Sequence, residues 1–401
     1  MSADMSYGLF ERYVREGELT LVDASGERHS FGHGSPSVTW RMKAAGTLPR
    51  ILKNPAYELG QTYMEGGWDV ADGSLADLLR LLRQNLAKAV LRHSALAPLA
   101  RIVQSWNNIK TSFSNVARHY DLDEALFRAF LDRDMHYSCA YFRRPDVSLE
   151  CAQQDKCRLI AAKLALHEGQ HVLDVGSGWG ALAFHLAREH GVRVTGLTLS
   201  KEQLRVATAE ADARGLADRV TFKLEDYRAH APSAQGAGRY DRIVSVGMFE
   251  HVGRHFYETY FRKFAELLTN DGCALLHTIG STAPPSPINP WIRRYIFPGG
   301  YIPALSEVGD AIERSGLIVT DLEILRDHYA LTLAEWNRRF QAQRARFVAS
   351  KGEAFCRMWE FYLITSQTAF ECRDLVVQQW QLGNHATALP VTRDYLYRSC
   401  D

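Results

Sequence analysis

The sequence predicts an α/β protein whose main domain is a mostly parallel sheet with helices on both faces. Between residue 169 and about 330, apolar strand patterns alternate with helical patterns, which is typical of βαβ units. The first strand, His171 to Val175, is apolar along most of its length, as expected when helices cover both faces of a sheet. A glycine-rich turn follows it directly.

The other elements of this region follow from the same alternation. Strands are predicted at residues 193–197, 220–224, 241–246 and 273–279, and helices at 181–189, 201–213 and 256–268. Residues 281–303 interrupt the pattern, because their six prolines are too many for a plain helix. We expect this segment to be an inserted flap over the carboxyl ends of the strands, where ligands bind in such sheets.

A length of 401 residues favours two domains. Residues 1–105 mix strand-like pieces and turns with a helical pattern from 75 to 103, which predicts a smaller N-terminal α+β domain. Residues 106–401 form the predicted main domain. It begins with a mostly helical stretch, 106–168, and its last 70 residues read as helix and then an extended tail.

Charge and cysteine content exclude some classes of protein. The 47 Lys and Arg residues nearly cancel the 46 Asp and Glu residues, whereas nucleic-acid binding usually requires a strongly basic face. The seven cysteines show no CxxC pair and no metal-ligand spacing, so we expect reduced thiols, no metal and a cytoplasmic location. We find no signal peptide and no apolar run near the ~20 residues that span a bilayer, so any membrane contact should be peripheral.

The glycine-rich turn is the strongest motif, and it reads VLDVGSGWG from Val172 to Gly180. Glycines permit a tight turn and let a ligand approach the backbone. The GxGxG spacing predicts the S-adenosylmethionine site of a Rossmann-like, class I methyltransferase, with Asp174, Gly176 and Gly178 beside the cofactor. A dinucleotide site, which would have the spacing GxGxxG, and a purely structural turn are the alternatives.

The second and third strands end in further candidates for cofactor binding. The acidic residue that often follows the second strand and binds ribose is missing, so we expect Thr198 and Gln203 to supply hydrogen bonds in its place. Asp226 follows the third strand, where it could meet an adenine amino group, and Tyr227 could lie against the ring. Both could equally be surface loop residues.

Several short motifs occur in a fixed order along the chain. They are HYDL at 119–122, YSCAYF at 137–142, the VLDVGSGWG turn, GLTLS at 196–200, FEHVG at 249–253, LHTI at 276–279, IFPGG at 296–300 and HYALTL at 328–333. In these motifs the chain resembles the cyclopropane-fatty-acyl-phospholipid synthases and the related mycolic acid cyclopropane synthases, over about residues 115–370. Residues 57–70 and 392–397 extend the likeness and favour the longer, phospholipid-acting enzymes.

The resemblance implies that a methylene group passes from S-adenosylmethionine to the double bond of an unsaturated phospholipid acyl chain, giving a cyclopropane. Attack by the alkene makes a carbocation, which requires an apolar and dry cavity. Four aromatic residues of the flap are candidates for its wall: Trp291, Tyr295, Phe297 and Tyr301.

The resemblance also implies that bound bicarbonate is the base that removes the last proton. The matching positions are Glu250, His277 and Tyr329 by side chain, and Cys139 and Ile279 by backbone. For the cofactor, they are Tyr137, Ser138, Gly176, Gly178, Thr198, Leu199, Gln203 and Tyr227. Ser366 stands where relatives carry a cysteine, which puts a covalent mechanism through a thiol at that position in doubt.

Two alternatives remain open, namely a related enzyme that makes methyl-branched or methylene chains and a lipid-binding protein with an inactive methyltransferase core. Residues 78–103 are rich in leucine and carry five basic residues and no acidic one: Arg80, Arg83, Lys88, Arg92 and Arg101. Such a helix can lie on anionic lipid or pack on its own domain. We expect the N-terminal domain to dock on the inner face of a phospholipid membrane, and a homodimer is a candidate assembly.

Overall fold

The computed structural model describes residues 3–87, 124–231, 238–386 and 388–396. These residues form two compact units, each made of separate pieces of the chain. The first unit joins the N-terminal residues with Pro287–Phe297 and Leu333–Asp374, and the second holds the rest. The predicted domain boundary near residue 105 lies outside the described residues.

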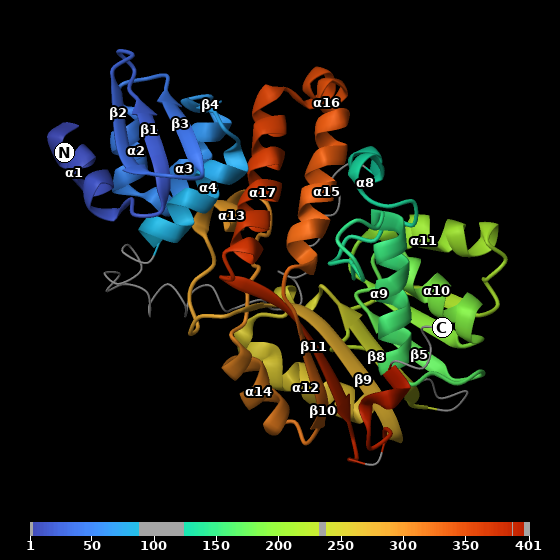
Figure 1. Ribbon diagram of the computed structural model, residues 1–401. Coiled ribbons are helices and arrows are strands. Elements are labelled where there is room, and N and C mark those ends of the chain that lie inside the picture. Colours follow the sequence, from blue (N-terminus) through green and yellow to red (C-terminus); the bar gives the residue numbers. More distant parts are fainter. Residues whose placement is uncertain (1–2, 88–123, 232–237, 387, 397–401) are drawn as a thin grey trace. The chain divides into compact units, whose positions relative to one another are not determined.

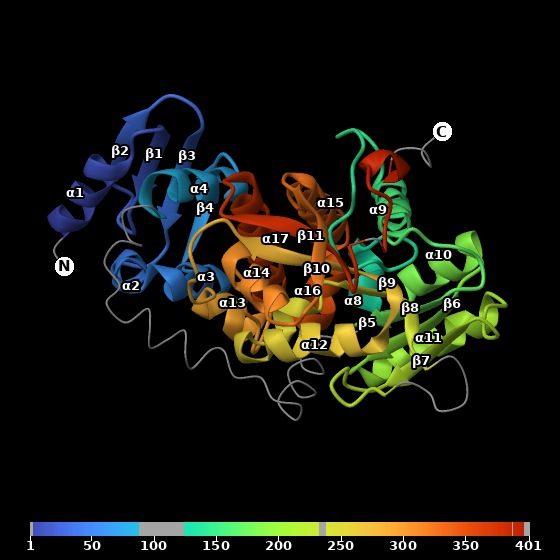
Figure 2. The ribbon, with the colours of Figure 1, turned by 90° about the horizontal axis from the view of Figure 1, so that it is seen from below.

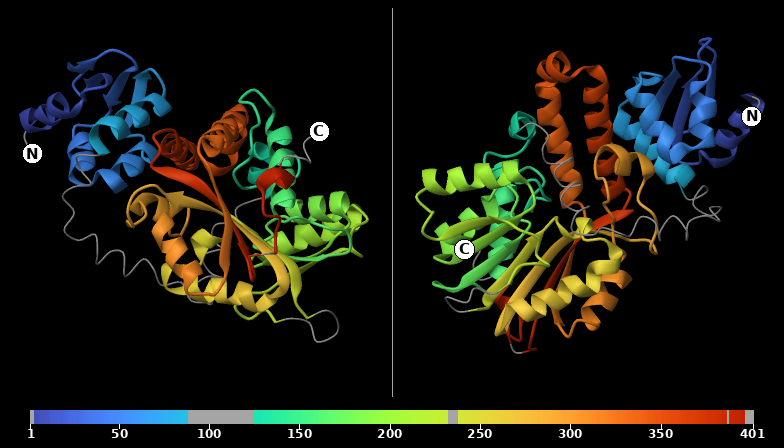
Figure 3. Two further views of the ribbon diagram at one scale, coloured as in Figure 1. Left: turned by 60° about the horizontal axis from the view of Figure 1, so that its bottom comes forward. Right: turned by 180° about the vertical axis from the view of Figure 1, so that it is seen from behind.

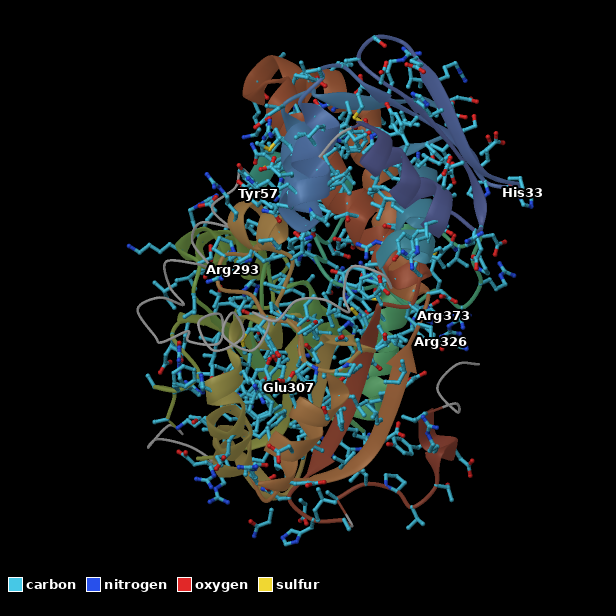
Figure 4. The ribbon with its side chains drawn as sticks, turned by 90° about the vertical axis from the view of Figure 1, so that its left-hand side faces the viewer. His33, Tyr57, Arg293, Glu307, Arg326 and Arg373 are labelled. Atoms are coloured by element: carbon cyan, nitrogen blue, oxygen red, sulfur yellow. The ribbon has the colours of Figure 1, made fainter. Side chains whose placement is uncertain are left out.

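The first unit contains a four-stranded sheet in the order β2-β1-β3-β4 (Figure 1). Its strands are β1 (Gly17–Val22), β2 (Arg28–His33), β3 (Ser37–Met42) and β4 (Trp68–Asp72). At the end of β2, His33 points away from the sheet (Figure 4). The helices are α1 (Ala3–Tyr13), α2 (Thr47–Lys53), α3 (Pro55–Met64), α4 (Leu75–Leu82), η1 (Arg83–Ala87), α13 (Pro290–Tyr295), α16 (Arg344–Lys351) and α17 (Glu353–Glu371), together with α15 (His328–Ala342) from Leu333 onward; the start of α15 belongs to the second unit.

Arginines join α17 to the N-terminal elements of this unit. Arg357 donates to Trp68 O at 2.8 Å and pairs with Asp69 at 2.7 Å. Of the five basic residues noted above, Arg80 pairs with Glu371 and Arg83 with Asp374, each at 2.8 Å. These two arginines are therefore engaged within the unit, and the other three lie outside the described residues.

The second unit is built on a seven-stranded sheet in the order β10-β11-β9-β8-β5-β6-β7 (Figure 2). Its strands are β5 (His171–Val175), β6 (Arg193–Thr198), β7 (Val220–Leu224), β8 (Tyr240–Val246), β9 (Leu268–Ser281), β10 (Ile318–Leu325) and β11 (Leu375–Gly383). Strands β5 to β9 pair in parallel, as predicted. The antiparallel strands β10 and β11 were not predicted. No strand was assigned between residue 279 and residue 330, and the last 70 residues were interpreted as helix and tail.

Helices cover both faces of this sheet (Figure 3). The helices of the second unit are α8 (Glu124–Phe130), α9 (Leu149–Lys163), α10 (Ala181–His190), α11 (Lys201–Ala213), η3 (Phe249–His251), η4 (Arg254–Phe256), α12 (Tyr257–Leu267), α14 (Leu305–Glu313) and η5 (Arg393–Leu396). Alternate strand residues enter two cores: Leu173 packs with α12 and α14, whereas Val172 packs with α9 and α10. Of the predicted helical stretch 106–168, only α8 and α9 are helical among the described residues.

The segment predicted as a flap divides between the two units. Trp291 of α13 packs in the first unit so closely that a Cβ on Gly60 would lie 2.8 Å from its ring. Tyr301 packs in the core of the second unit. Among the described residues, no helix is both long and apolar enough to cross a membrane.

Candidate active site

The glycine turn connects β5 to α10 and has left-handed backbone at Gly176, Gly178 and Gly180, with φ values of 88°, 55° and 89°. An added Cβ at Gly176 would lie 2.7 Å from Met248, and one at Gly180 would lie 2.7 Å from Phe222. At Gly178 it would meet no atom within 4 Å. Packing therefore requires glycine at positions 176 and 180. Gly178 instead borders a cavity that the turn lines.

All ten predicted cofactor residues line this one cavity. They are Tyr137, Ser138, Asp174, Gly176, Gly178, Thr198, Leu199, Gln203, Asp226 and Tyr227. Residues that sequence reasoning missed lie beside them, including His136, Lys156, Trp179 and Met248. The turn and the strand ends thus bring together residues from 137 to 227 at the carboxyl edge of the parallel sheet, where ligands bind in this class of fold.

The predicted ribose and adenine contacts are already ordered by neighbouring side chains. Thr198 Oγ1 donates to Gln203 Oε1 at 2.8 Å, which leaves the Gln203 amide nitrogen as a donor. Both carboxylate oxygens of Asp226 accept from Arg228, at 2.6 and 2.8 Å. Tyr227 lies edge-on to Tyr260, with ring centroids 5.1 Å apart.

Asp174 is a buried carboxylate at the end of β5, and its Oδ2 has no hydrogen-bond partner among the described residues. Burial raises the pKa of Asp174 to about 7, while Lys156 acts in the opposite direction. The Lys156 ammonium is itself buried and donates to Ser138 Oγ at 2.9 Å. A buried acceptor on the cavity wall suits the cationic groups of S-adenosylmethionine, so these residues fit that cofactor.

A hydrogen-bonded chain of buried side chains runs from His136, on the cavity wall, to residues that no sequence signal indicated. His136 Nδ1 lies 2.8 Å from Asp132 Oδ2, and its Nε2 lies 3.2 Å from Cys157 Sγ. Burial opposes a charged ring, but Cys157 and Asp132 raise the pKa of His136 to about 9. Because Asp132 and Cys157 contact opposite ring nitrogens, the three side chains do not converge on one point as metal ligands would.

Glu250 lies in η3, directly after β8, and is buried. Its Oε1 accepts a hydrogen bond from the Ile279 N–H at 2.6 Å, and its backbone oxygen accepts from the Tyr301 N–H at 2.8 Å. Tyr301 is held in turn by Glu307 of α14, labelled in Figure 4. Glu250 Oε2 has no hydrogen-bond partner among the described residues, and burial raises the pKa of this carboxyl.

His277 lies on β9, two residues before Ile279 and on the same face of the strand. Its Nδ1 lies 3.0 Å from Nε2 of Gln379 on β11, a residue that sequence reasoning missed together with its strand. Burial lowers the pKa of His277 to about 3, with Lys156 and Lys163 acting in the same direction. The imidazole is therefore neutral at physiological pH.

The other two predicted residues of the bicarbonate set lie in different elements. Cys139 is fully buried, and burial raises the pKa of its thiol. Tyr329 is half-buried in the first turn of α15. Glu250, His277, Tyr329, Cys139 and Ile279 are not among the residues that line the cofactor cavity, but Cys139 directly follows Ser138 and Glu250 directly precedes His251, which do line it.

A family model described as mycolic acid cyclopropane synthetase matches residues 107–380. The chain belongs to this family. The cyclopropane-fatty-acyl-phospholipid synthase of Escherichia coli K12 is 37% identical over 352 residues, which are 87% of this chain and 88% of that protein. A probable fatty acid methyltransferase of Pseudomonas putida is 36% identical over 377 residues, which are 91% of this chain and 92% of that protein.

Among solved structures, the mycolic acid cyclopropane synthase CmaA1 complexed with SAH and CTAB is 35% identical, with a TM-score of 0.62. The match covers 67% of this chain and 97% of that one. The predicted family and the predicted class I methyltransferase fold are thus both confirmed, and this member of the cyclopropane synthetase family is an S-adenosylmethionine-dependent methyltransferase.

Proposed function

We propose that the enzyme transfers a methylene group from S-adenosylmethionine to the double bond of unsaturated acyl chains of membrane phospholipids and forms a cyclopropane ring. The observation that carries this proposal is the buried Glu250, with Oε1 held by the Ile279 N–H and Oε2 without a hydrogen-bond partner among the described residues. A carboxylate so placed can accept a hydrogen bond from a hydroxyl group, such as that of bicarbonate.

The residues of the cofactor cavity bind and orient S-adenosylmethionine, which supplies the carbon. The alkene is a weak nucleophile, so the reaction depends on holding it in line with the methyl group. The buried carboxylate of Asp174 would hold the cationic part of the cofactor, and the open space at the Gly178 backbone would allow close approach.

Glu250, His277 and Tyr329 by side chain, and Cys139 and Ile279 by backbone, would hold bicarbonate. When bound, this anion would supply the base for the final deprotonation. Neutral His277 contributes a hydrogen-bond donor, and Glu250 contributes an acceptor. Because the like charge of Glu250 repels an anion, the donors around it must offset that repulsion.

For the substrate to be reached, the enzyme must attach to a membrane surface. We propose peripheral attachment to the inner face through the N-terminal region, with a homodimer as the expected assembly. Flotation with vesicles of anionic and of zwitterionic phospholipid tests the attachment. Binding that does not depend on anionic lipid would count against a basic docking surface.

A second product is favoured by the likeness to the probable fatty acid methyltransferase of Pseudomonas putida. The same cofactor and the same cation would give a methyl-branched, still unsaturated chain if the proton left from a neighbouring chain carbon. They would give a methylene chain if a hydride shift first moved the cation to the methyl-bearing carbon and the methyl group then lost a proton. The outcomes therefore share the cofactor site and differ in how the cation is resolved.

Mass spectrometry of fatty acids from cells expressing the enzyme tests both products. We expect a species about 14 mass units above the mono-unsaturated parent, since one methylene group is added, and resistance to mild hydrogenation would distinguish a ring from a methylene branch. No change in any lipid would overturn the proposal. Glu250→Gln should abolish product while cofactor binding stays within twofold; full activity of this variant would remove Glu250 from the mechanism.

A further inference from the structure

A row of polar side chains crosses three neighbouring strands behind His277, and all of them except the partly exposed Glu323 are buried. Gln379 on β11 is paired directly with His277 on β9, and Glu323 on β10 is paired directly with Gln379. Lys163, at the end of α9, reaches the row from the covering helix layer. Its ammonium donates to Gln379 Oε1 at 2.7 Å and pairs with Glu323.

The chemistry of Lys163 sets the direction of every hydrogen bond in this row. An ammonium can only donate, so the Gln379 oxygen must face it, and the Gln379 amide nitrogen must then face His277. The opposite amide orientation would set two donors against each other at Lys163. Gln379 Nε2 therefore donates to His277 Nδ1 across 3.0 Å. Because Nδ1 is an acceptor, the single proton of the neutral ring lies on Nε2.

The surroundings of His277 hold the ring in this neutral form. The side chain is 2% exposed, and the cations Lys156 and Lys163 both disfavour a second proton on it. A neutral N–H group can donate a hydrogen bond to an anion without giving up its proton, so an anion bound there keeps its basicity. An imidazolium would instead share its proton with the bound base.

We infer that Gln379 and Lys163 are positioning residues that fix His277 as the Nε2–H tautomer, so that His277 donates to the catalytic anion. The inference rests on the proposed function, because it assigns His277 to the anion site. It also gives a reason for the uncharged amide of Gln379 and the buried Lys163 beside His277. The Lys163 ammonium is itself paired with Glu323.

The tautomer can be read directly by nitrogen-15 NMR of histidine-labelled full-length enzyme, with His277→Gln used to assign the His277 signals. We expect a neutral ring with its proton on Nε2 in the wild type. In Gln379→Glu, the new carboxylate accepts from both Lys163 and His277, so the proton should move to Nδ1. A wild-type ring protonated on Nδ1, or on both nitrogens, would overturn the inference whatever the variant does.

Kinetics at varied bicarbonate concentration test the consequence. Gln379→Glu should raise the KM for bicarbonate about tenfold or more, since the donor is replaced by an acceptor, while the Kd for S-adenosylhomocysteine stays within twofold. Gln381→Glu is the matched control, because Gln381 is a buried glutamine on the same strand that donates to Lys163 O and to Tyr395 instead. The control should keep the wild-type tautomer and the wild-type KM for bicarbonate.

The two assays separate the inference from the function beneath it. Wild-type turnover that does not respond to bicarbonate would overturn the anion site, even if the Nε2–H tautomer is found. A correct tautomer that moves in Gln379→Glu with no change in the KM for bicarbonate would leave the anion site standing and overturn the positioning role.

Discussion

Gly178→Ala tests whether the glycine turn is needed for cofactor binding separately from its role in the fold. An alanine Cβ at this position would meet no protein atom within 4 Å, so packing does not resist it. Its φ of 55° is left-handed, and this conformation costs a non-glycine residue roughly 1–2 kcal/mol. The open space beside Gly178 belongs to the cofactor cavity. We therefore expect a modest loss of stability together with a large loss of cofactor affinity.

Gly215 provides a matched control in the same unit. It has a φ of 65°, and an added Cβ would meet no atom within 4 Å, but it lies after α11 and does not line the cavity. Urea denaturation should show that Gly178→Ala and Gly215→Ala each lower the free energy of unfolding by about 1–2 kcal/mol. Titration calorimetry with S-adenosylhomocysteine should show at least a tenfold weaker Kd, about 1.4 kcal/mol, for Gly178→Ala alone.

A third variant tests the packing side of the same reasoning. Gly176→Ala combines a φ of 88° with a Cβ only 2.7 Å from Met248, so it should destabilise the protein more than either of the others. The reasoning is refuted if Gly178→Ala binds the cofactor as tightly as the wild type. It is equally refuted if Gly215→Ala weakens binding to the same extent, since strain alone would then explain the effect.

Three further outcomes follow from single contacts. Burial raises the pKa of Asp174 from 3.8 to about 7. The folded protein therefore binds the Asp174 proton more tightly than the unfolded chain does, and the resulting gain in the free energy of unfolding is complete below pH 3.8 and is lost as the pH rises through 7. Asp174→Asn should thus stabilise the cofactor-free protein more at pH 8 than at pH 5, by up to about 2 kcal/mol in urea denaturation; an equal effect would contradict this. Arg357 donates from Nε to Tyr63 O and from Nη2 to Trp68 O and Asp69. Arg357→Lys has one nitrogen in place of these two and should lower the free energy of unfolding by about 2 kcal/mol; a loss below about 0.5 kcal/mol would show that the two-armed contact contributes little. Ser366→Cys should leave turnover unchanged, and a large gain in turnover would restore a role for a thiol.

That residues after the strands of the parallel sheet share one cavity could be predicted from sequence, because local patterns determine those strands. In a parallel sheet the carboxyl ends of neighbouring strands meet at one edge, so residues just after those strands must share a cavity. The predicted strands and helices from His171 to Leu224 agree with the structure to within one residue. Asp174, Thr198 and Asp226 were therefore found together, although the chain separates them by up to 52 residues.

The part that sequence reasoning missed is polar and buried. Strand β11 carries Gln378, Gln379 and Gln381, and each of these side chains is at most 2% exposed. Because they are polar, the strand lacks the continuous apolar run that indicates a buried strand in a sequence. Only tertiary partners make such burial tolerable, because each amide must find its hydrogen bonds. Lys163 and His277 supply these bonds for Gln379. A pattern read along the chain cannot show partners that lie 102 and 216 residues away.

Burial drives Asp174 toward its neutral form, and that has a measurable consequence for cofactor binding. With a pKa of about 7, Asp174 is about half protonated at pH 7 in the cofactor-free protein. The sulfonium and amino groups of S-adenosylmethionine are cations, and a nearby cation favours the ionised carboxylate. Binding at pH 7 should therefore release about half a proton from Asp174.

Calorimetry in two buffers of different ionisation enthalpy measures this release as a difference in apparent binding enthalpy. Asp174→Asn should abolish the difference, and identical enthalpies for the wild type in both buffers would show that Asp174 does not meet the cationic part of the cofactor.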